Sequence, residues 1–233
     1  MSNQTTPAAP KQKMVKRFSK PFIIAHWLNV AAFFTLYISA LPMYTEFFDW
    51  IYLIFGGPEN CRLIHRIAAV AFTLPAIFLI IADPKSFFFW IKQMFTWKKH
   101  DFQFFPKFAL EFLGKHVDDM PKQDFFNAGE KINSILQVVT TILIIGSGII
   151  MWFANSFPRE VVQWAYPIHN TAMALAIAVV VGHIYLATAL SKPSMQGMIT
   201  GEVVEEYARD HHGRWYDELK AEEAKQAQQN KKA

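Results

Sequence analysis

The chain has 233 residues, a formal net charge of +4 and a single cysteine, with 52% hydrophobic and 18% charged residues. It is too rich in apolar and too poor in charged residues for a soluble domain. The lone Cys61 excludes a disulfide framework and a thiolate metal cluster within the chain.

Four segments are long and apolar enough to cross a bilayer as helices. They lie at about 21–43, 62–82, 132–154 and 166–190. A basic tail at 1–20 precedes them and a charged tail at 191–233, predicted to form a helix from Glu202, follows them. The sequence therefore predicts an all-α membrane protein, a bundle of four transmembrane helices in one domain at 21–190.

The connector at 83–131 separates the second span from the third and carries many lysines. Its apolar stretch Phe87–Trp97 is too short to span a bilayer and is expected to lie in the membrane interface. The two short connectors carry almost no Lys or Arg. Because cytoplasmic loops are the basic ones, we expect both termini and the long connector in the cytoplasm.

Four histidines lie inside the predicted spans at two depths. His26 and His183 lie near the cytoplasmic ends of the first and fourth spans, and His65 and His169 near the outer ends of the second and fourth. His169 and His183 are 14 residues apart, so on one helix both rings leave nearly the same face, about 21 Å apart along the axis. The depths predict an inner pair, His26 and His183, and an outer pair, His65 and His169.

Ionisable side chains inside a membrane mark functional sites by default. The alternative for any single histidine is a hydrogen bond to a neighbouring helix. Two imidazoles are too few for a zinc or copper site, whereas haem needs only two axial ligands, and two imidazoles suit electron transfer. The spacing therefore favours two haems, with Arg17, Arg62 and Arg66 as candidate partners of their propionates.

Several segments together resemble the gamma, cytochrome b subunit of membrane-bound formate dehydrogenases over nearly the full length. They are Lys16-Arg17-Phe18, Ala25-His26-Trp27, Cys61-Arg62-Leu63-Ile64-His65, Phe126-Asn127-Ala128-Gly129-Glu130-Lys131, Ile168-His169, His183-Ile184-Tyr185, Gln196-Gly197-Met198-Ile199-Thr200-Gly201 and His211-His212-Gly213-Arg214-Trp215-Tyr216.

The resemblance implies a diheme cytochrome of the bacterial cytoplasmic (inner) membrane, with the histidines paired as their depths suggest. Electrons would enter at the outer haem from an iron–sulfur (beta) subunit, itself fed by a molybdenum or tungsten catalytic (alpha) subunit. They would leave from the inner haem to a quinone, menaquinone or ubiquinone. The chain itself would hold no formate-oxidising centre, and a higher oligomer of the complex is compatible with this reading.

The resemblance also implies that Asn127, Gly129 and His183 contact the quinone. Read from the residues alone, Asn127 is a helix N-cap, with Glu130 at the capping-box position. His211 and His212 are expected at a solvated helix end, and His100 and His116 in the connector are also expected to be solvated.

Other functions remain open on the sequence alone. Related diheme subunits serve hydrogenases and thiosulfate or polysulfide reductases, so the partner complex is less determined than the bundle. A proton channel or transporter built on histidine relays, or a membrane anchor without redox function, are the alternatives from other classes. No feature of the sequence indicates a nucleic-acid partner.

Overall fold

The computed structural model describes residues 12–113, 115, 117 and 119–231. The long helices are α1 (Lys20–Tyr44), α3 (Pro58–Ala82), α6 (Ala128–Trp152) and α7 (Arg159–Tyr185). The shorter elements are β1 (Met14–Lys16), η1 (Glu46–Phe48), α2 (Ile51–Phe55), α4 (Pro84–Phe95), α5 (Lys99–Phe112), η2 (Ala154–Ser156), η3 (Leu186–Leu190), α8 (Lys192–Thr200), β2 (Glu202–Val204), α9 (Glu205–His211) and α10 (Gly213–Asn230).

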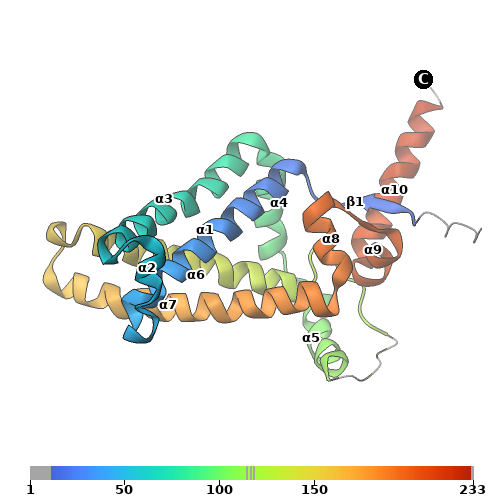
Figure 1. The fold of residues 1–233 in the computed structure, drawn as a ribbon. Helices are drawn as coiled ribbons and strands as arrows, with labels where there is room; N and C mark the ends of the chain where they lie inside the picture. The colour runs from blue at the N-terminus through green and yellow to red at the C-terminus, as the bar shows by residue number, and fades with distance from the viewer. Residues whose placement is uncertain (1–11, 114, 116, 118, 232–233) are drawn as a thin grey trace, which may run out of the picture.

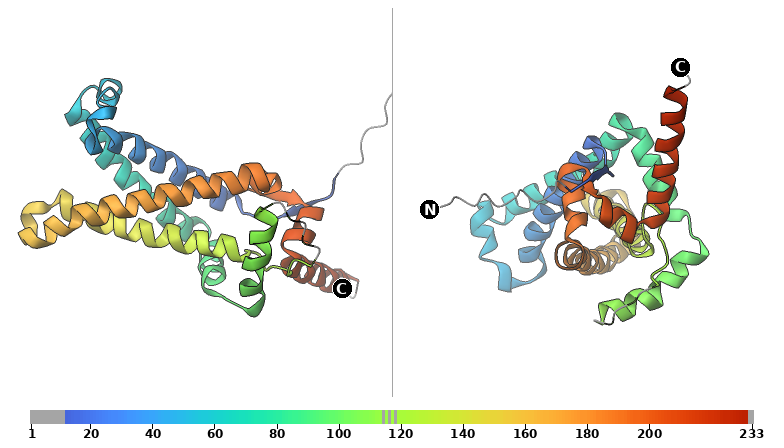
Figure 2. Two further views of the ribbon diagram at one scale, coloured as in Figure 1. Left: turned by 90° about the horizontal axis from the view of Figure 1, so that it is seen from below. Right: turned by 90° about the vertical axis from the view of Figure 1, so that its right-hand side faces the viewer.

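The four long helices form two pairs, α1 with α3 and α6 with α7 (Figures 1 and 2). The first pair makes almost no direct contacts with the second. The short helix α4 packs against both α3 and α6 and so joins the pairs at one end. All four long helices are apolar enough to cross a membrane, the last as the continuous segment Arg159–Ala189. The predicted four-helix membrane bundle is confirmed.

Small residues line the contact between α1 and α3. Along α1 the buried positions Ala25, Ala32 and Ser39 recur every seven residues, which returns the helix to nearly the same face. Facing them, α3 buries Cys61 and Ala68 at the same spacing. Such side chains let helix backbones approach closely in a membrane. Large apolar side chains on the other faces are exposed, as lipid contact requires.

The N-terminal turn of α6 shows how a helix start is encoded. The Asn127 side chain accepts from the backbone N–H of Glu130, and the Glu130 carboxylate accepts from the backbone N–H of Asn127. The predicted capping box is therefore confirmed. It starts α6 at Ala128, before the expected start at 132, because these bonds satisfy N–H groups that a helix start leaves unpaired.

Two short strands depart from the all-helical expectation. β1 pairs antiparallel with β2, Val15 facing Val203, so the segment predicted to be helical from Glu202 starts as a strand and is helical only from Glu205, in α9 and α10. Gly201 precedes β2 with a φ of +83°, and an added Cβ would lie 2.8 Å from the carbonyl oxygen of Phe18. The backbone N–H groups of Arg17 and Phe18 donate to the Gly201 carbonyl, so the approach must be close.

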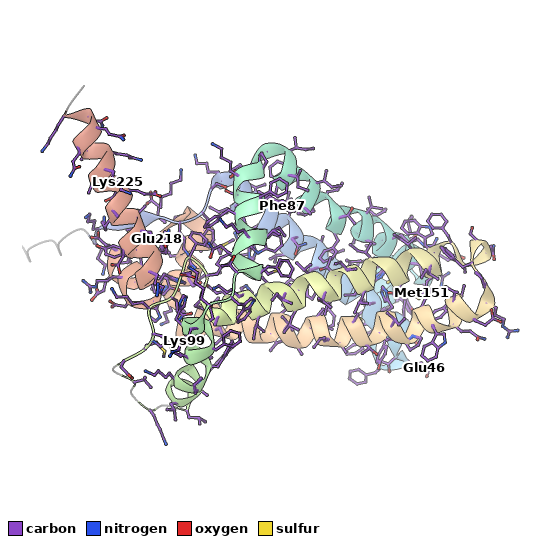
Figure 3. The ribbon with its side chains drawn as sticks, turned by 180° about the vertical axis from the view of Figure 1, so that it is seen from behind. Glu46, Phe87, Lys99, Met151, Glu218 and Lys225 are labelled. Atoms are coloured by element: carbon purple, nitrogen blue, oxygen red, sulfur yellow. The ribbon has the colours of Figure 1, made fainter. Side chains whose placement is uncertain are left out.

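The sheet defines one end of the bundle, which we call the sheet end. The connector helix α5 and the tail helix α10 also lie there, near the labelled Lys99 and Glu218 (Figure 3). The opposite end, where α2 and η2 lie and where Glu46 and Met151 are labelled, is called the turn end. Both ends of the described chain therefore lie on the same side of the bundle (Figure 1).

A buried ion cluster fastens the connector to α6. The Lys131 ammonium is fully buried and lies 2.7 Å from Asp101 Oδ1, 3.4 Å from Asp124 Oδ2 and 3.0 Å from the Thr96 carbonyl oxygen. His100, expected to be solvated, is buried with its Nε2 3.2 Å from Asp124. The corresponding expectation for His116 lies outside the described residues.

The charges in this cluster are compensated. Burial would raise the pKa of Asp124, but the hydrogen bond from Lys98 and the charge of Lys131 hold that pKa below its usual value. His100, Asp101 and Asp124 stand close enough to suggest a metal site. Lys131 already pairs with both carboxylates, so this cluster is read as an ion pair that docks α5 onto α6.

We predict that Asp101→Ala destabilises the folded chain by about 3–5 kcal/mol, because it leaves the Lys131 charge buried with its main partner removed. Thermal unfolding of the purified protein measures this. Asp119→Ala is the control, because Asp119 pairs with Lys107 at the exposed surface. Equal unfolding temperatures for the two variants would contradict the buried cluster.

Candidate cofactor site

The sheet-end pair consists of His26 on α1 and His183 on α7. Their ring centroids are 6.3 Å apart, with an angle of 70° between the ring planes. Metal–imidazole bonds of about 2.0 Å, with each nitrogen about 1.1 Å from its ring centre, would place two centroids roughly 6 Å apart across a metal ion. The structure brings these two predicted ligands together, at a spacing that admits one metal ion.

The turn-end pair consists of His65 on α3 and His169 on α7, which lie close enough to interact electrostatically. Each ring is held by a serine on the neighbouring helix. Ser39 Oγ lies 2.9 Å from His65 Nδ1, and Ser147 Oγ lies 3.0 Å from His169 Nδ1. Because the serines bind Nδ1, the other ring nitrogen, Nε2, remains available in both rings. Sequence reasoning did not single out these two serines.

The two pairs are separate sites. His169 and His183 lie on one continuous helix, α7, so 14 residues separate the levels by about 21 Å. Within the described ranges, no third histidine, cysteine or carboxylate joins either pair to make a larger metal-binding group. A cofactor that brings its own equatorial ligands and needs two protein ligands at each level fits this donor set.

Glycines leave room beside the histidines. A Cβ added to Gly146 or Gly182 would meet nothing within 4 Å, whereas one added to Gly148 would lie 3.5 Å from His169 Cε1. An apolar cavity of about 420 Å³ lies between α6 and α7, lined in part by Gly146 and Ser147. No histidine lines this cavity, so space for a large, flat group held by the histidines lies instead at the boundary between the helix pairs, where contacts are sparse.

The three candidate arginines differ in their surroundings. Arg17 is buried, and its Nη2 donates to the Phe125 carbonyl at 2.8 Å and to Glu130 at 3.0 Å. Its Nε and Nη1 have no hydrogen-bond partner among the described residues, although the guanidinium lies over the rings of Phe18, Phe125 and Trp215. Arg17 also lines a cavity of about 70 Å³ between α1 and α4. Arg62 and Arg66 are exposed, and Arg66 lies over the ring of Trp152 at 5.3 Å. Only Arg17 of the three offers buried, unpaired donors.

Asn127 and Gly129 lie together in the first turn of α6. An added Cβ at Gly129 would lie 3.2 Å from Asn127 Oδ1. The side-chain oxygen of Asn127, Oδ1, accepts the cap hydrogen bond. Its Nδ2 has no hydrogen-bond partner among the described residues and can donate to another acceptor. No direct contact joins either residue to His183, but Glu130 in the same turn lies within electrostatic reach of that ring. The structure therefore places this turn near the sheet-end pair.

His212 is fully buried, which corrects the expectation of a solvated helix end. Its ring packs against Tyr207 and Trp215, and its Nδ1 lies 3.1 Å from the Asp124 carbonyl oxygen. Burial, together with the charge of Arg17, lowers the pKa of His212 to about 3, although Glu130 acts in the opposite direction. The ring is therefore neutral at physiological pH. It is buried because α9 and α10 fold back onto the segment before α6.

Comparison with known proteins identifies related chains. Residues 17–201 match the family described as prokaryotic cytochrome b561, which covers all four histidines of the two pairs. The chain is similar to the nitrate-inducible formate dehydrogenase cytochrome b556(Fdn) subunit of Escherichia coli strain K12. The two are 29% identical over 227 residues, which cover 92% of this chain and 96% of that protein.

Two further relatives carry similar names. The formate dehydrogenase cytochrome b556(fdo) subunit of Escherichia coli strain K12 is 26% identical over 221 residues, 94% of this chain and 99% of that subunit. The formate dehydrogenase cytochrome b556 subunit of Haemophilus influenzae is 26% identical over 205 residues, 87% of this chain and 82% of that subunit. The similarity thus extends beyond the membrane helices into both tails.

We predict that the sheet end loses stability as the pH falls below about 6.5, where His212 would gain a proton in the unfolded chain but remains neutral in the fold. With a folded pKa of about 3, the loss reaches about 2 kcal/mol between pH 7.5 and 5. The charged or titratable groups facing the ring are Arg17, Glu130 and His211. Unfolding curves at both pH values measure the loss.

His212→Gln keeps a polar side chain that does not titrate, so it should flatten this pH dependence. His211→Gln, at an exposed position, serves as the comparison and should change the dependence far less, because His211 is the smallest of the contributions that lower the pKa of His212. An unchanged pH dependence in His212→Gln would show that another group is responsible.

Proposed function

We propose, since the chain belongs to the prokaryotic cytochrome b561 family, that it is the membrane cytochrome b subunit of a formate dehydrogenase complex. The names of its relatives support the partner enzyme. The observation that carries the proposal is the meeting of histidines across the two helix pairs, with ring centroids 6.3 Å apart at the sheet end.

We assign His26 and His183 as the axial ligands of one b-type haem and His65 and His169 as those of a second. When bound, these haems supply iron centres that each take up and release one electron. The chain would supply two imidazoles at each level, which would leave neither iron an open position for oxygen. The apolar walls between the helix pairs exclude water from the macrocycles.

We assign Arg17 to the propionates of the sheet-end haem. Its Nε and Nη1 are buried without a partner, and such donors are costly unless a ligand satisfies them. Phe22, which lines the same cavity, stands four residues before His26 and so on nearly the same face of α1. Arg62 and Arg66 remain candidates at the turn end by their position near His65.

We further propose that a quinone, menaquinone or ubiquinone, is reduced at the sheet end beside His183. Asn127 Nδ2 has no hydrogen-bond partner among the described residues and can donate to a quinone carbonyl. A side chain at position 129 would crowd Asn127, because an added Cβ would lie 3.2 Å from its Oδ1. The backbone N–H groups of Ala128, Glu130 and Lys131 are already bonded within the protein, which leaves, among the described residues of this turn, the N–H of Gly129 for a carbonyl oxygen. The basic tails and connector support a cytoplasmic location for this end, from which the protons would then come.

Within this proposal the turn end faces outward and accepts electrons from an iron–sulfur (beta) subunit, behind which lies a molybdenum or tungsten catalytic (alpha) subunit. The chain is then a multi-pass protein of the bacterial inner membrane with both termini in the cytoplasm. The even number of candidate spans, with β1 and α10 on one side, supports the placement of the termini.

We predict that the purified chain holds two b-type haems and that His65→Ala or His169→Ala removes only one of them. His26→Ala or His183→Ala should remove the other one, and quinone reduction with it. Reduced-minus-oxidised spectra and haem content per polypeptide measure this. His211→Ala, an exposed histidine outside both pairs, is the control and should retain both haems.

The proposal fails if the inserted wild-type chain is colourless. The pairing fails if the His65 and His169 variants lose different haems.

We predict that Asn127→Asp raises the KM for quinone about five- to tenfold, because it removes a donor whose hydrogen bond is worth about 1 kcal/mol. An aspartate keeps the N-cap oxygen and suits a helix N-terminus, so the unfolding temperature should not fall. Steady-state quinone reduction by the whole complex gives KM and kcat separately. A wild-type KM in a stable Asn127→Asp complex would remove Asn127 from the quinone site.

A further inference from the structure

We propose that Ser39 and Ser147 are positioning residues of the turn-end pair, and that they hold His65 and His169 in the tautomer with Nδ1 protonated. The inference rests on the proposed function, because it concerns how these two rings present a nitrogen to haem iron. It follows from counting protons at each serine.

In the first helix pair the proton of Ser39 is already committed. Ser39 Oγ lies 2.7 Å from the Thr35 carbonyl oxygen and 3.1 Å from the Leu36 carbonyl oxygen. A hydroxyl has one proton and a carbonyl only accepts, so Ser39 donates to the backbone of α1. Towards His65 Nδ1, at 2.9 Å, the same oxygen can therefore only accept. Nδ1 carries the ring proton, and Nε2 is left with its lone pair free.

The second helix pair, α6 with α7, repeats this arrangement of serine and histidine. Ser147 Oγ lies 2.6 Å from the Leu143 carbonyl oxygen and 3.2 Å from the Ile144 carbonyl oxygen, so its proton goes to the backbone of α6. His169 Nδ1, 3.0 Å from the same Oγ, must donate to it. In both helix pairs, therefore, a serine on one helix orients a histidine on its neighbour. Both rings keep Nε2 unprotonated and available to a metal ion.

The surrounding sequence repeats as well. Cys61 and Ala68 are buried four residues before and three residues after His65. Ala165 and Ala172 are buried at the same offsets from His169. Small buried residues at the same offsets therefore allow the close helix contact at both serine–histidine hydrogen bonds.

The two sheet-end histidines have no such hydroxyl partner. In the described part of the chain no serine or threonine hydroxyl bonds to the ring of His26 or His183, and the two rings meet each other with their planes steeply inclined. The two haem sites therefore differ in the groups behind their ligands, although both use two imidazoles.

The difference has a consequence for electron transfer. A ligand imidazole that donates its other N–H becomes a stronger electron donor and is fixed in orientation. Stronger donation favours the oxidised iron, so the serines lower the reduction potential at the turn end. Under the proposed function electrons enter there, and a lower potential at the entry haem makes transfer towards the sheet end favourable.

The test uses the intact complex with Ser39→Ala, Ser147→Ala and the double variant. Optical redox titration gives the two midpoint potentials, and electron paramagnetic resonance gives the two low-spin signals. We expect both haems to be retained, one midpoint to shift upward with a change in its low-spin signal, and the other to stay. The shift should be larger in the double variant.

Thr140→Val is the matched control. Thr140 is buried on α6 and donates to the Leu136 carbonyl as the serines donate to theirs, but it contacts no histidine among the described residues. Both midpoints should stay at their wild-type values. Ser39→Thr and Ser147→Thr keep a hydroxyl and should restore the wild-type midpoint. If an alanine variant does not assemble, the cysteine variant keeps the volume, offers a weaker acceptor and should give the same shift.

Two results would overturn the inference. One is a double variant with two haems whose midpoints and low-spin signals both match the wild type. The other is an equal shift of both haems, which would reflect a change in the whole bundle. A wild-type complex in which this chain holds no haem would refute the proposed function instead.

Discussion

An ionisable ring inside a bilayer is unfavourable unless it has a partner, and four such rings impose that condition on this bundle. Helix α7 carries one histidine at each level, while α1 and α3 carry the other two. The rings can meet only across the boundary between the two helix pairs. This accounts for a fold that packs tightly within each pair, through small residues, and sparsely between the pairs.

A second concentration of interactions lies at the start of α6. Two successive residues there face different partners: Glu130 pairs with Arg17 from the N-terminal segment, and Lys131 pairs with Asp101 from the connector. The tail joins the same cluster through His212. Three segments that are distant in sequence are thus fixed to one helical turn beside the sheet-end histidines, where the proposed quinone site needs a rigid wall.

How far the sequence predicts this structure depends on whether a signal is local. The apolar runs predict the spans, and the depths of the histidines predict which rings face each other, because both follow from helix periodicity. The packing of α1 with α3 and of α6 with α7 was not predicted. The capping box at Asn127 is equally local. The β1–β2 pairing joins residues nearly 190 positions apart through strands of three residues, which are too short to show a period. The resemblance to a family contributed the quinone residues, which periodicity does not predict.

The predictions that failed for single residues failed because the deciding contacts come from distant segments. His100 and His212 were expected in water because polar residues surround them in sequence, yet the partners that bury them come from other segments. Ser39 and Ser147 gave no signal because a serine in a membrane helix ordinarily bonds only to its own backbone. Their second role becomes visible once the neighbouring helix is in place.

The antiparallel sheet has a consequence for biogenesis. Val15 leaves the ribosome long before its partner Val203, so the two strands can join only after Val203 has been made. The same delay applies to α7, on which one ligand of each pair depends. The α1–α3 hairpin must therefore stay in the membrane with His26 and His65 without their partner rings until α7 has been made.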